Sequence, residues 1–175
     1  MNGLVEDLRA VPDLVLLQDP AELQRFSRDA YDYSPVLKAQ LDRCQADLVV
    51  RPSSVAAVEA LAAACYRHRV PLTLRGTGTG NYGQSVPLEG GVVMLTTALQ
   101  RVRSIDPHTG VVTVEPGCSL RELDQQLRLQ GRQLRLLPST WRSATIGGFL
   151  AGGSGGIGSI RWGFLRDPGL SLIHI

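Results

Sequence analysis

A segment that alternates glycine with hydrogen-bond donors has the clearest chemical potential in this chain. Residues 75–84 read RGTGTGNYGQ and follow an apolar, strand-like run. Backbone N–H groups of a glycine-rich turn can converge on an anion, and arginine, threonine and asparagine side chains donate well to phosphate oxygens. A flexible surface loop is the alternative, but such loops seldom combine this spacing with these donors. The candidate binding residues are Arg75, Gly76, Thr77, Gly78, Thr79, Gly80, Asn81, Tyr82 and Gln84.

A second glycine-rich segment runs over residues 145–156 with the sequence TIGGFLAGGSGG. Of the 19 glycines, only Gly3 precedes Gly76, so glycine is concentrated in the later part of the chain. A mobile hinge is the alternative for the second segment, but Ile146 and Phe149 favour burial. A glycine loop anchored by apolar residues is typical of backbone that packs flat against a ligand. Two such loops together indicate a large ligand with several polar segments.

Two familiar nucleotide-binding motifs match by spacing but not by context. Residues 78–83 and 153–158 both have the spacing G-x-G-x-x-G of dinucleotide-binding proteins. That motif requires a preceding strand and a helix that begins at the glycines. Residues 84–91 contain Pro87 and cannot form that helix, and no strand is expected before residue 153. A nucleoside-triphosphate loop is excluded too, because no glycine is followed by Lys-Ser or Lys-Thr.

No residue can be assigned as a catalytic acid, base, nucleophile or metal ligand. The histidines are isolated in the sequence, and we expect surface positions for them. There is no pair of carboxylates and no cluster with metal-ligand spacing. Cys44, Cys65 and Cys118 match neither a disulfide framework nor a zinc site. We expect small buried side chains in a reducing cytoplasm.

The composition is that of one globular domain without an evident macromolecular partner. The chain has 175 residues, of which 43% are hydrophobic and 19% charged, and its net charge is +2. This balance gives no case for nucleic acid or a membrane surface as the main partner. No apolar run approaches the roughly 20 residues of a transmembrane helix, and the N-terminus lacks the features of a signal peptide. We therefore expect a cytoplasmic protein.

The first glycine loop follows a predicted strand–helix–strand unit. Residues 48–50 are an apolar strand, residues 55–65 have helical spacing, and residues 71–74 are the next strand. Such a unit implies a parallel pair of strands with a right-handed crossover. Residues 91–95 are a third strand, whereas residues 1–45 are expected to be a lead-in of helices and loops.

The second half of the chain is predicted to hold a hairpin and a capped helix. Residues 102–105 and 111–114 flank a turn-rich segment. Residues 119–122 (SLRE) have the pattern of a capping box, and Gly131 is a plausible end signal for the helix that follows. Residues 144–151 are compatible with a loop or with one or two helical turns.

Several short motifs occur in an order that resembles a known family. They are Arg75-Gly76-x-Gly78-Thr79-Gly80, Val114-Glu115-Pro116-Gly117, Thr145-Ile146-Gly147-Gly148 and Arg161-Trp162-Gly163. After the strand–helix–strand unit, this set resembles the FAD-binding domain of the vanillyl-alcohol oxidase and p-cresol methylhydroxylase flavoproteins. The resemblance is closest in style to the branch of the glycolate oxidase D-subunit and D-lactate dehydrogenase. It covers about residues 45–168, and the ordered set is more specific than any single motif.

The resemblance implies an α+β fold of the p-cresol methylhydroxylase (PCMH) type. Within a partial FAD-binding domain at residues 46–169, a small parallel β-α-β subdomain (46–96) should lead into a mixed sheet (97–169). The cofactor implied is FAD, with residues 76–84 around its diphosphate and residues 138–156 along the flavin and ribityl chain. The candidate FAD-binding residues of this second region are Pro138, Ser139, Thr145, Gly147, Gly148, Gly152 and Gly155.

The flavin is expected to be held non-covalently. Covalent members of the resembling family attach it through His, Cys or Tyr, commonly through a His in the diphosphate loop, where this chain has Thr79. Residues 139–145, which the resemblance places near the flavin ring, contain neither Cys nor His.

Members of the resembling family oxidise hydroxy acids, alcohols or sugar lactones by hydride transfer to flavin N5. The resemblance therefore implies part of an FAD-dependent oxidoreductase that acts on a 2-hydroxy acid or similar alcohol, with an unknown electron acceptor. Two alternatives stay open. One is a relative of UDP-N-acetylenolpyruvoylglucosamine reductase, and the other is a non-catalytic nucleotide-binding or interaction module.

The chain is shorter than the members of the family that it resembles. Further strands of the FAD-binding domain and the substrate-binding cap are absent, so we expect the 175-residue chain alone to be inactive. Residues 170–175 (LSLIHI) break the pattern, and we expect this tail to be foreign to the gene.

Overall fold

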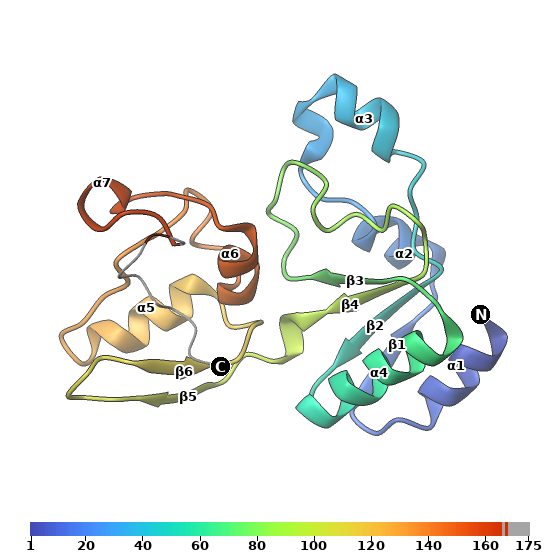
Figure 1. Ribbon diagram of the computed structural model, residues 1–175, viewed down its shortest axis with the longest axis horizontal. Coiled ribbons are helices and arrows are strands. Elements are labelled where there is room, and N and C mark those ends of the chain that lie inside the picture. The colour runs from blue at the N-terminus through green and yellow to red at the C-terminus, as the bar shows by residue number, and fades with distance from the viewer. Residues whose placement is uncertain (166, 168–175) are drawn as a thin grey trace. The chain divides into compact units, whose positions relative to one another are not determined.

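The computed structural model describes residues 1–165 and 167 (Figure 1). It divides the chain into two compact units, Met1–Leu99 and Gln100–Ile175, which we call unit 1 and unit 2. Each unit has its own cluster of buried apolar side chains. The expected foreign tail at residues 170–175 and His174 lie outside the described residues.

Unit 1 is built on a four-stranded sheet in the order β1-β2-β4-β3. The strands are β1 (Leu14–Leu17), β2 (Leu48–Pro52), β3 (Leu72–Arg75) and β4 (Val92–Leu95). The last three are mutually parallel, whereas β1 joins the edge at β2 in antiparallel orientation. The sheet of unit 1 is therefore mixed.

Strand β4 lies between the two strands of the predicted strand–helix–strand unit. The prediction that β2 and β3 are parallel and joined through a helix is confirmed, but the two strands are not neighbours. All four side chains of β4 are buried, so this apolar strand takes the central position. Strand β3 is left at the edge, where the side chain of Leu74 is 59% exposed.

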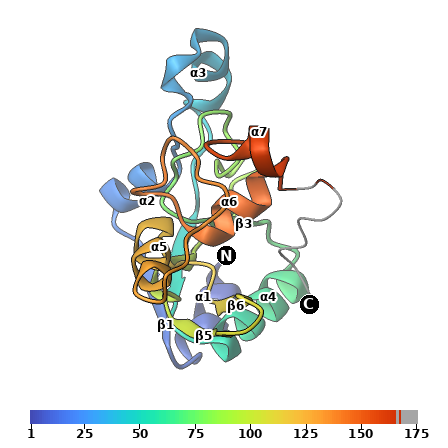
Figure 2. The ribbon, with the colours of Figure 1, turned by 90° about the vertical axis from the view of Figure 1, so that its left-hand side faces the viewer.

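Two helices cover one face of this sheet. Helix α4 (Val55–His68) begins at Ser54, whose hydroxyl accepts a hydrogen bond from the Ala57 N–H at 3.1 Å. Helix α1 (Asn2–Arg9) packs beside α4, and both views of the ribbon show the pair together (Figures 1 and 2). The buried side chains of this layer are Leu4, Leu8, Leu48, Val50, Leu61, Ala64, Cys65, Val92 and Met94.

The opposite face of the sheet is covered by the short helix α2 (Pro20–Phe26). Leu23 and Phe26 of α2 pack against Val49 and Val93, whose side chains alternate with those of the first face. Beyond α2 come a 3₁₀ turn, η1 (Tyr31–Tyr33), and helix α3 (Pro35–Leu41). A second 3₁₀ turn, η2 (Thr96–Ala98), ends unit 1.

Residues 1–45 contain the expected helices, but they also contribute a strand. The four apolar residues of β1 pair with β2 in the register Leu14 to Pro52. They lie in the same compact unit as the parallel strands. The run is too short for its periodicity to distinguish strand from loop, and pairing with β2 decides its conformation.

Unit 2 contains the predicted hairpin and capped helix. Strands β5 (Val102–Ile105) and β6 (Val112–Val114) pair in antiparallel orientation. Helix α5 (Leu120–Arg128) begins at Ser119, whose hydroxyl accepts from the Glu122 N–H at 3.1 Å. Helices α6 (Ile146–Gly152) and α7 (Ser159–Trp162) follow. Buried side chains of the core are Cys118, Leu120, Leu123, Leu127, Leu136, Ala144, Ile146, Phe149 and Leu165.

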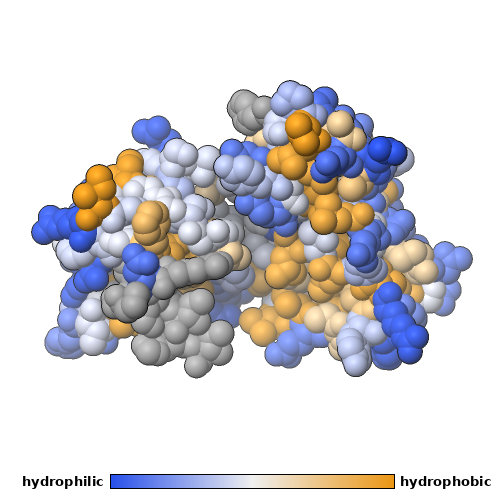
Figure 3. Space-filling model, turned by 45° about the horizontal axis from the view of Figure 1, so that its top comes forward, coloured by the Kyte–Doolittle hydropathy of each residue, from blue (hydrophilic) through white to orange (hydrophobic). Residues whose placement is uncertain are grey.

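The α+β class is confirmed, with its mixed sheet in unit 1 and an antiparallel pair in the described part of unit 2. On the face that Figure 3 shows, hydrophobic and hydrophilic residues are intermixed at the surface.

No helix among the described residues is both long and apolar enough to cross a bilayer.

Candidate cofactor-binding site

The first glycine loop connects two parallel neighbours, β3 and β4. Because parallel strands start at the same edge of a sheet, residues 76–91 must return from the carboxyl end of β3 to the start of β4. Ligands of open α/β sheets bind at the carboxyl ends of strands. Residues 84–91 contain turns and bends but no helix, which confirms that the dinucleotide fingerprint does not apply here.

Gly78 and Arg75 are in close contact at the beginning of this loop. Gly78 has a φ of +72°, a conformation that side-chain-bearing residues rarely adopt. A Cβ atom at Gly78 would overlap the guanidinium of Arg75. Arg75 is only 7% exposed, so its guanidinium lies beneath the loop backbone rather than in solvent.

The buried guanidinium of Arg75 is incompletely hydrogen-bonded. Its Nη1 donates to the Ser85 hydroxyl at 3.2 Å, and its Cζ lies 5.9 Å from the centre of the Phe26 ring. Burial lowers the pKa of Arg75, and the nearby charge of Asp29 opposes that shift. Nε is buried and has no hydrogen-bond partner in the part of the chain that the structure describes. The loop therefore rests on a buried positive charge.

The tip of the loop is closed by its own residues. The Gln84 Oε1 accepts from the Tyr82 N–H at 3.1 Å, and a Cβ on Gly80 would stand 2.7 Å from the same oxygen. Tyr82 itself is 72% exposed. Gln84 was predicted as a ligand residue, and here its side chain holds the loop in shape.

Several consecutive backbone N–H groups of the loop have no acceptor within the described residues. They include those of Gly78, Thr79, Gly80 and Asn81, which lie between the buried Arg75 and the exposed tip. Unpaired N–H groups in a glycine turn next to an arginine are the donor set that a phosphate or diphosphate needs. The residues present therefore fit the phosphate-containing ligand expected from the sequence.

The second glycine segment begins at the N-terminus of α6. The buried Thr145 is the N-cap, and its Oγ1 accepts from the Gly148 N–H at 3.3 Å. The Gly147 N–H donates to the Pro116 carbonyl at 2.9 Å, and a Cβ at Gly147 would stand 2.7 Å from the Pro116 Cβ. Gly147 is therefore required by packing inside unit 2, and both N–H groups are already bonded.

The other predicted residues of unit 2 lie around a short bridge. Leu137 and Ile157 pair in antiparallel fashion, which places the buried Pro138 and the exposed Ser139 just after the bridge. A Cβ at Gly155 would meet the Phe164 ring at 2.6 Å. A Cβ at Gly152 would meet only the Ser154 hydroxyl, at 3.5 Å. The segment before residue 153 is helix α6, so the second G-x-G-x-x-G match also lacks its strand.

Asp29 is a residue of the first loop's surroundings that the sequence analysis missed. Its Oδ1 accepts from the Tyr31 N–H at 3.0 Å, and its Oδ2 is buried without a partner among the described residues. Burial raises the pKa of this carboxyl group. Asp29 precedes Gly80 by about fifty residues, and no local pattern marks their contact.

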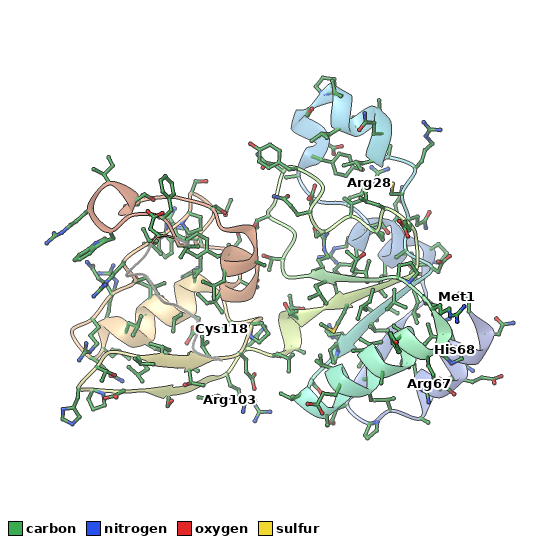
Figure 4. The ribbon with its side chains drawn as sticks, viewed as in Figure 1. Met1, Arg28, Arg67, His68, Arg103 and Cys118 are labelled. Carbon is green, nitrogen blue, oxygen red and sulfur yellow. The ribbon has the colours of Figure 1, made fainter. Side chains whose placement is uncertain are left out.

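The described part of the chain contains no evident catalytic acid or metal centre. His68 is exposed at the end of α4, where Nε2 lies 2.8 Å from Asp7 Oδ2 beside the exposed Arg67 (Figure 4). His108 is exposed in the hairpin turn. No group of three His, Cys, Asp or Glu among the described residues could hold a metal ion.

Two of the three cysteines are buried in the apolar cores of the two units. Cys65 and Cys118 are buried as predicted, and Cys44 is half-buried. Burial raises the pKa of both the Cys65 and the Cys118 thiols. None of the three forms a disulfide.

Comparison with known proteins identifies the family of this chain. Residues 46–172 match the family described as FAD binding domain. The chain belongs to this family of FAD-binding domains. FAD is thus the ligand of the family, and its diphosphate has the chemistry for which the free N–H groups of the first loop are suited.

Curated relatives of this FAD-binding domain are named as oxidases and dehydrogenases. The chain is 30% identical to glycolate oxidase subunit GlcD of Bacillus subtilis (strain 168) over 143 residues, which are 82% of this chain and 29% of that protein. It is 35% identical to the probable mitochondrial D-lactate dehydrogenase of Danio rerio over 131 residues, 74% of this chain and 26% of that protein. The chain thus spans less than a third of the length of these relatives.

Solved structures of other proteins have the same fold as this chain. An alkyldihydroxyacetonephosphate synthase superposes with a TM-score of 0.81 at 25% identity, over 95% of this chain and 35% of that one. Substrate-bound p-cresol methylhydroxylase superposes with a TM-score of 0.67 at 21% identity, over 85% of this chain and 28% of that one. The second match confirms the expected PCMH-type fold.

Proposed function

We propose that this FAD-binding domain holds the FAD diphosphate on the loop at residues 76–84. The observation that carries the proposal is the set of free N–H groups at Gly78, Thr79 and Asn81, above the buried guanidinium of Arg75. Backbone donors and a cation in a half-buried site stabilise a diphosphate without any change in the protonation of the protein. The positive φ of Gly78 brings the backbone, rather than a side chain, to the ligand.

In this proposal the flavin and ribityl chain lie along residues 138–156 of unit 2. The support is chemical. Exposed Ser139 offers a hydroxyl, and exposed Gly148 and Gly152 allow close approach of backbone to a flat ring. Gly147 and Gly155 contribute by shaping the unit, because each faces a neighbour within it.

FAD is held non-covalently in this proposal. The loop has Thr79 where covalent relatives commonly have a histidine, and threonine is not among the residues that those relatives use for the bond to the flavin methyl group. Cys118 is fully buried with a raised thiol pKa, which disfavours the nucleophilic thiolate.

The reaction proposed for the complete protein is oxidation of a 2-hydroxy acid to the corresponding 2-oxo acid. Relatives named for glycolate and D-lactate support this substrate class. Bound flavin supplies an acceptor for the hydride that leaves the carbinol carbon. The hydroxyl proton must pass to a base, for which no described residue of this chain is a candidate. The contribution of this chain is to bind and orient the cofactor.

Two measurements test the proposal. The purified protein should absorb at roughly 450 nm, as oxidised flavin does, and the extracted flavin should run as FAD rather than FMN on chromatography. The complete protein should then reduce an artificial dye with D-lactate or glycolate but not with the matching methyl ester. A colourless protein that gains no flavin on incubation with FAD would contradict the proposal, and so would a flavoprotein inactive with every 2-hydroxy acid tested.

A further inference from the structure

A segment ahead of the family match holds the diphosphate loop from the side. The Ala30 N–H donates to the Gly80 carbonyl at 2.8 Å, and this bond joins the residue just before η1 to the middle of the loop. Tyr31, Leu41 and Val86 form a small buried cluster at the same place. Figures 1 and 2 show α3 and its neighbouring turn beside the loop. The matched FAD-binding domain begins at residue 46, so this support lies outside it.

Asp29 is the polar centre of this contact. Burial raises the pKa of its carboxyl group, and the Tyr31 N–H, which donates to Oδ1 at 3.0 Å, opposes that shift. The charge that faces it is Arg75 at the end of β3, and Arg25 of α2 acts on Arg75 in turn. Asp29 is half-buried, but its Oδ2 is closed off from solvent without a partner among the described residues, which is costly unless a nearby positive charge compensates.

We propose that Asp29 is a positioning residue of the FAD site, which fixes the loop at residues 76–85 and balances the buried charge of Arg75. The inference rests on the proposed function, in which this loop binds the diphosphate. Asp29 does not need to touch FAD. It stands on the side of Gly80 where a Cβ would project, 3.6 Å from that position, and Oδ2 is closed off from solvent.

The direction in which FAD affinity changes when the Asp29 carboxylate is removed distinguishes a positioning role from mere closeness to the ligand. A carboxylate near a diphosphate repels it, so an Asp29 with no positioning role would weaken FAD binding, and its removal would tighten it. A carboxylate that orders the loop has the opposite effect. Its loss removes the bond to the Tyr31 N–H beside the Ala30–Gly80 contact and leaves Arg75 without the charge of Asp29.

The test compares Asp29→Asn and Asp29→Ala with Asp32→Asn in the full protein. Asp32 is an exposed carboxylate three residues away that pairs with Lys38 at 3.2 Å. We expect both Asp29 variants to raise the dissociation constant of FAD about tenfold, the loss of one charge-assisted hydrogen bond. Asp32→Asn should bind FAD like the wild type.

A pH profile gives a readout that a purely structural role would not change. Because the pKa of Asp29 is raised, its negative charge is lost at a higher pH than that of an ordinary aspartate. Wild-type FAD affinity should therefore weaken as pH falls from neutrality toward about 4, and the affinity of Asp29→Asn should be weak and flat over the same interval. An unchanged or tighter affinity in Asp29→Asn would overturn the inference.

Hydrogen exchange without FAD keeps the inference testable if a variant is poorly stable. The amides of Ala30 and Tyr31, which donate to Gly80 and to Asp29, should exchange about tenfold faster in Asp29→Asn, while those of β2 and α4 keep their wild-type rates. Uniform acceleration throughout unit 1 would mean that Asp29 serves the fold as a whole, and the inference would be wrong. A wild type that binds no FAD would instead contradict the proposed function, and this inference would fall with it.

Discussion

The guanidinium of Arg75 occupies the space that any side chain on Gly78 would require. The backbone of the loop and the buried charge below it therefore depend on each other. A residue with a Cβ at position 78 must either leave the left-handed conformation or displace Arg75. Both changes would move the N–H groups of Gly78 and Thr79, which the proposed function assigns to the diphosphate.

Gly78→Ala should weaken FAD binding. The left-handed conformation costs a residue with a side chain about 1 to 2 kcal/mol, and displacement of Arg75 adds to that cost. We expect the dissociation constant of FAD to rise at least about tenfold, measured by titration of flavin fluorescence.

Gly131→Ala is the matched control for this experiment. Gly131 has a similar φ of +68°, but a Cβ there would have nothing within 4 Å. The variant should lose about 1 kcal/mol of unfolding free energy through backbone strain alone and should bind FAD normally. An equal loss of FAD affinity in both variants would refute a specific role for Gly78.

Gly147→Ala should destabilise unit 2. A Cβ at this position would stand 2.7 Å from the Pro116 Cβ and 2.8 Å from the Pro116 carbonyl oxygen. Such overpacking costs about 1 to 3 kcal/mol. Both tryptophans of the chain, Trp141 and Trp162, belong to unit 2, so urea unfolding followed by tryptophan fluorescence reports on this unit.

Gly152→Ala in the same helix provides the comparison. Its Cβ would have ordinary contact with Ser154, and alanine favours helix over glycine by up to about 1 kcal/mol. The unfolding free energy should be unchanged or slightly raised. Equal destabilisation by the two substitutions would show that the contact between Gly147 and Pro116 is unimportant.

Glu115 should give unit 2 an acid-sensitive component of stability. Its carboxylate accepts from the Arg101 N–H at 2.9 Å and from Arg103 at 3.0 Å. The backbone bond, followed by Arg103, holds the pKa of Glu115 below its ordinary value of 4.5. The folded state therefore binds this proton less readily than the unfolded state. The stabilisation is present above the unfolded pKa and is lost as pH falls through the folded pKa.

Glu115→Gln should lower the unfolding free energy at neutral pH by about 1 to 2 kcal/mol and reduce its decline in acid. Urea unfolding of both proteins at several values from roughly pH 7 to 3 measures this difference. Glu122→Gln, on the exposed face of α5, should change neutral stability by less than about 0.5 kcal/mol. Parallel acid profiles of wild type and Glu115→Gln would contradict the assignment.

Flavin should leave the protein on denaturation. No covalent bond is expected at Thr79, and Cys118 is buried with a raised thiol pKa. Acid precipitation of the holoprotein should leave the yellow colour in the supernatant. A fluorescent band at the mass of the protein on a denaturing gel would show a covalent link and refute this prediction.

Local sequence patterns predicted most elements because their causes are local. Ser54 and Ser119 cap α4 and α5 through bonds to residues three positions later, and a hairpin joins residues 102–105 to 112–114. The ambiguous segment before residue 152 is a helix because Thr145 caps it and Ile146 and Phe149 are buried in the core of unit 2.

The amino-acid sequence alone determined the two glycine loops, their donors and the family they belong to, because spacing and residue type are properties of a short segment. Tertiary structure alone decided which strands are neighbours and what lies beneath each loop. The insertion of β4 between β2 and β3, the pairing of β1 with β2, and the approach of Asp29 and Ala30 to Gly80 all join distant segments. Burial and hydrogen bonding across the folded chain choose these partners, and no pattern along the chain records them.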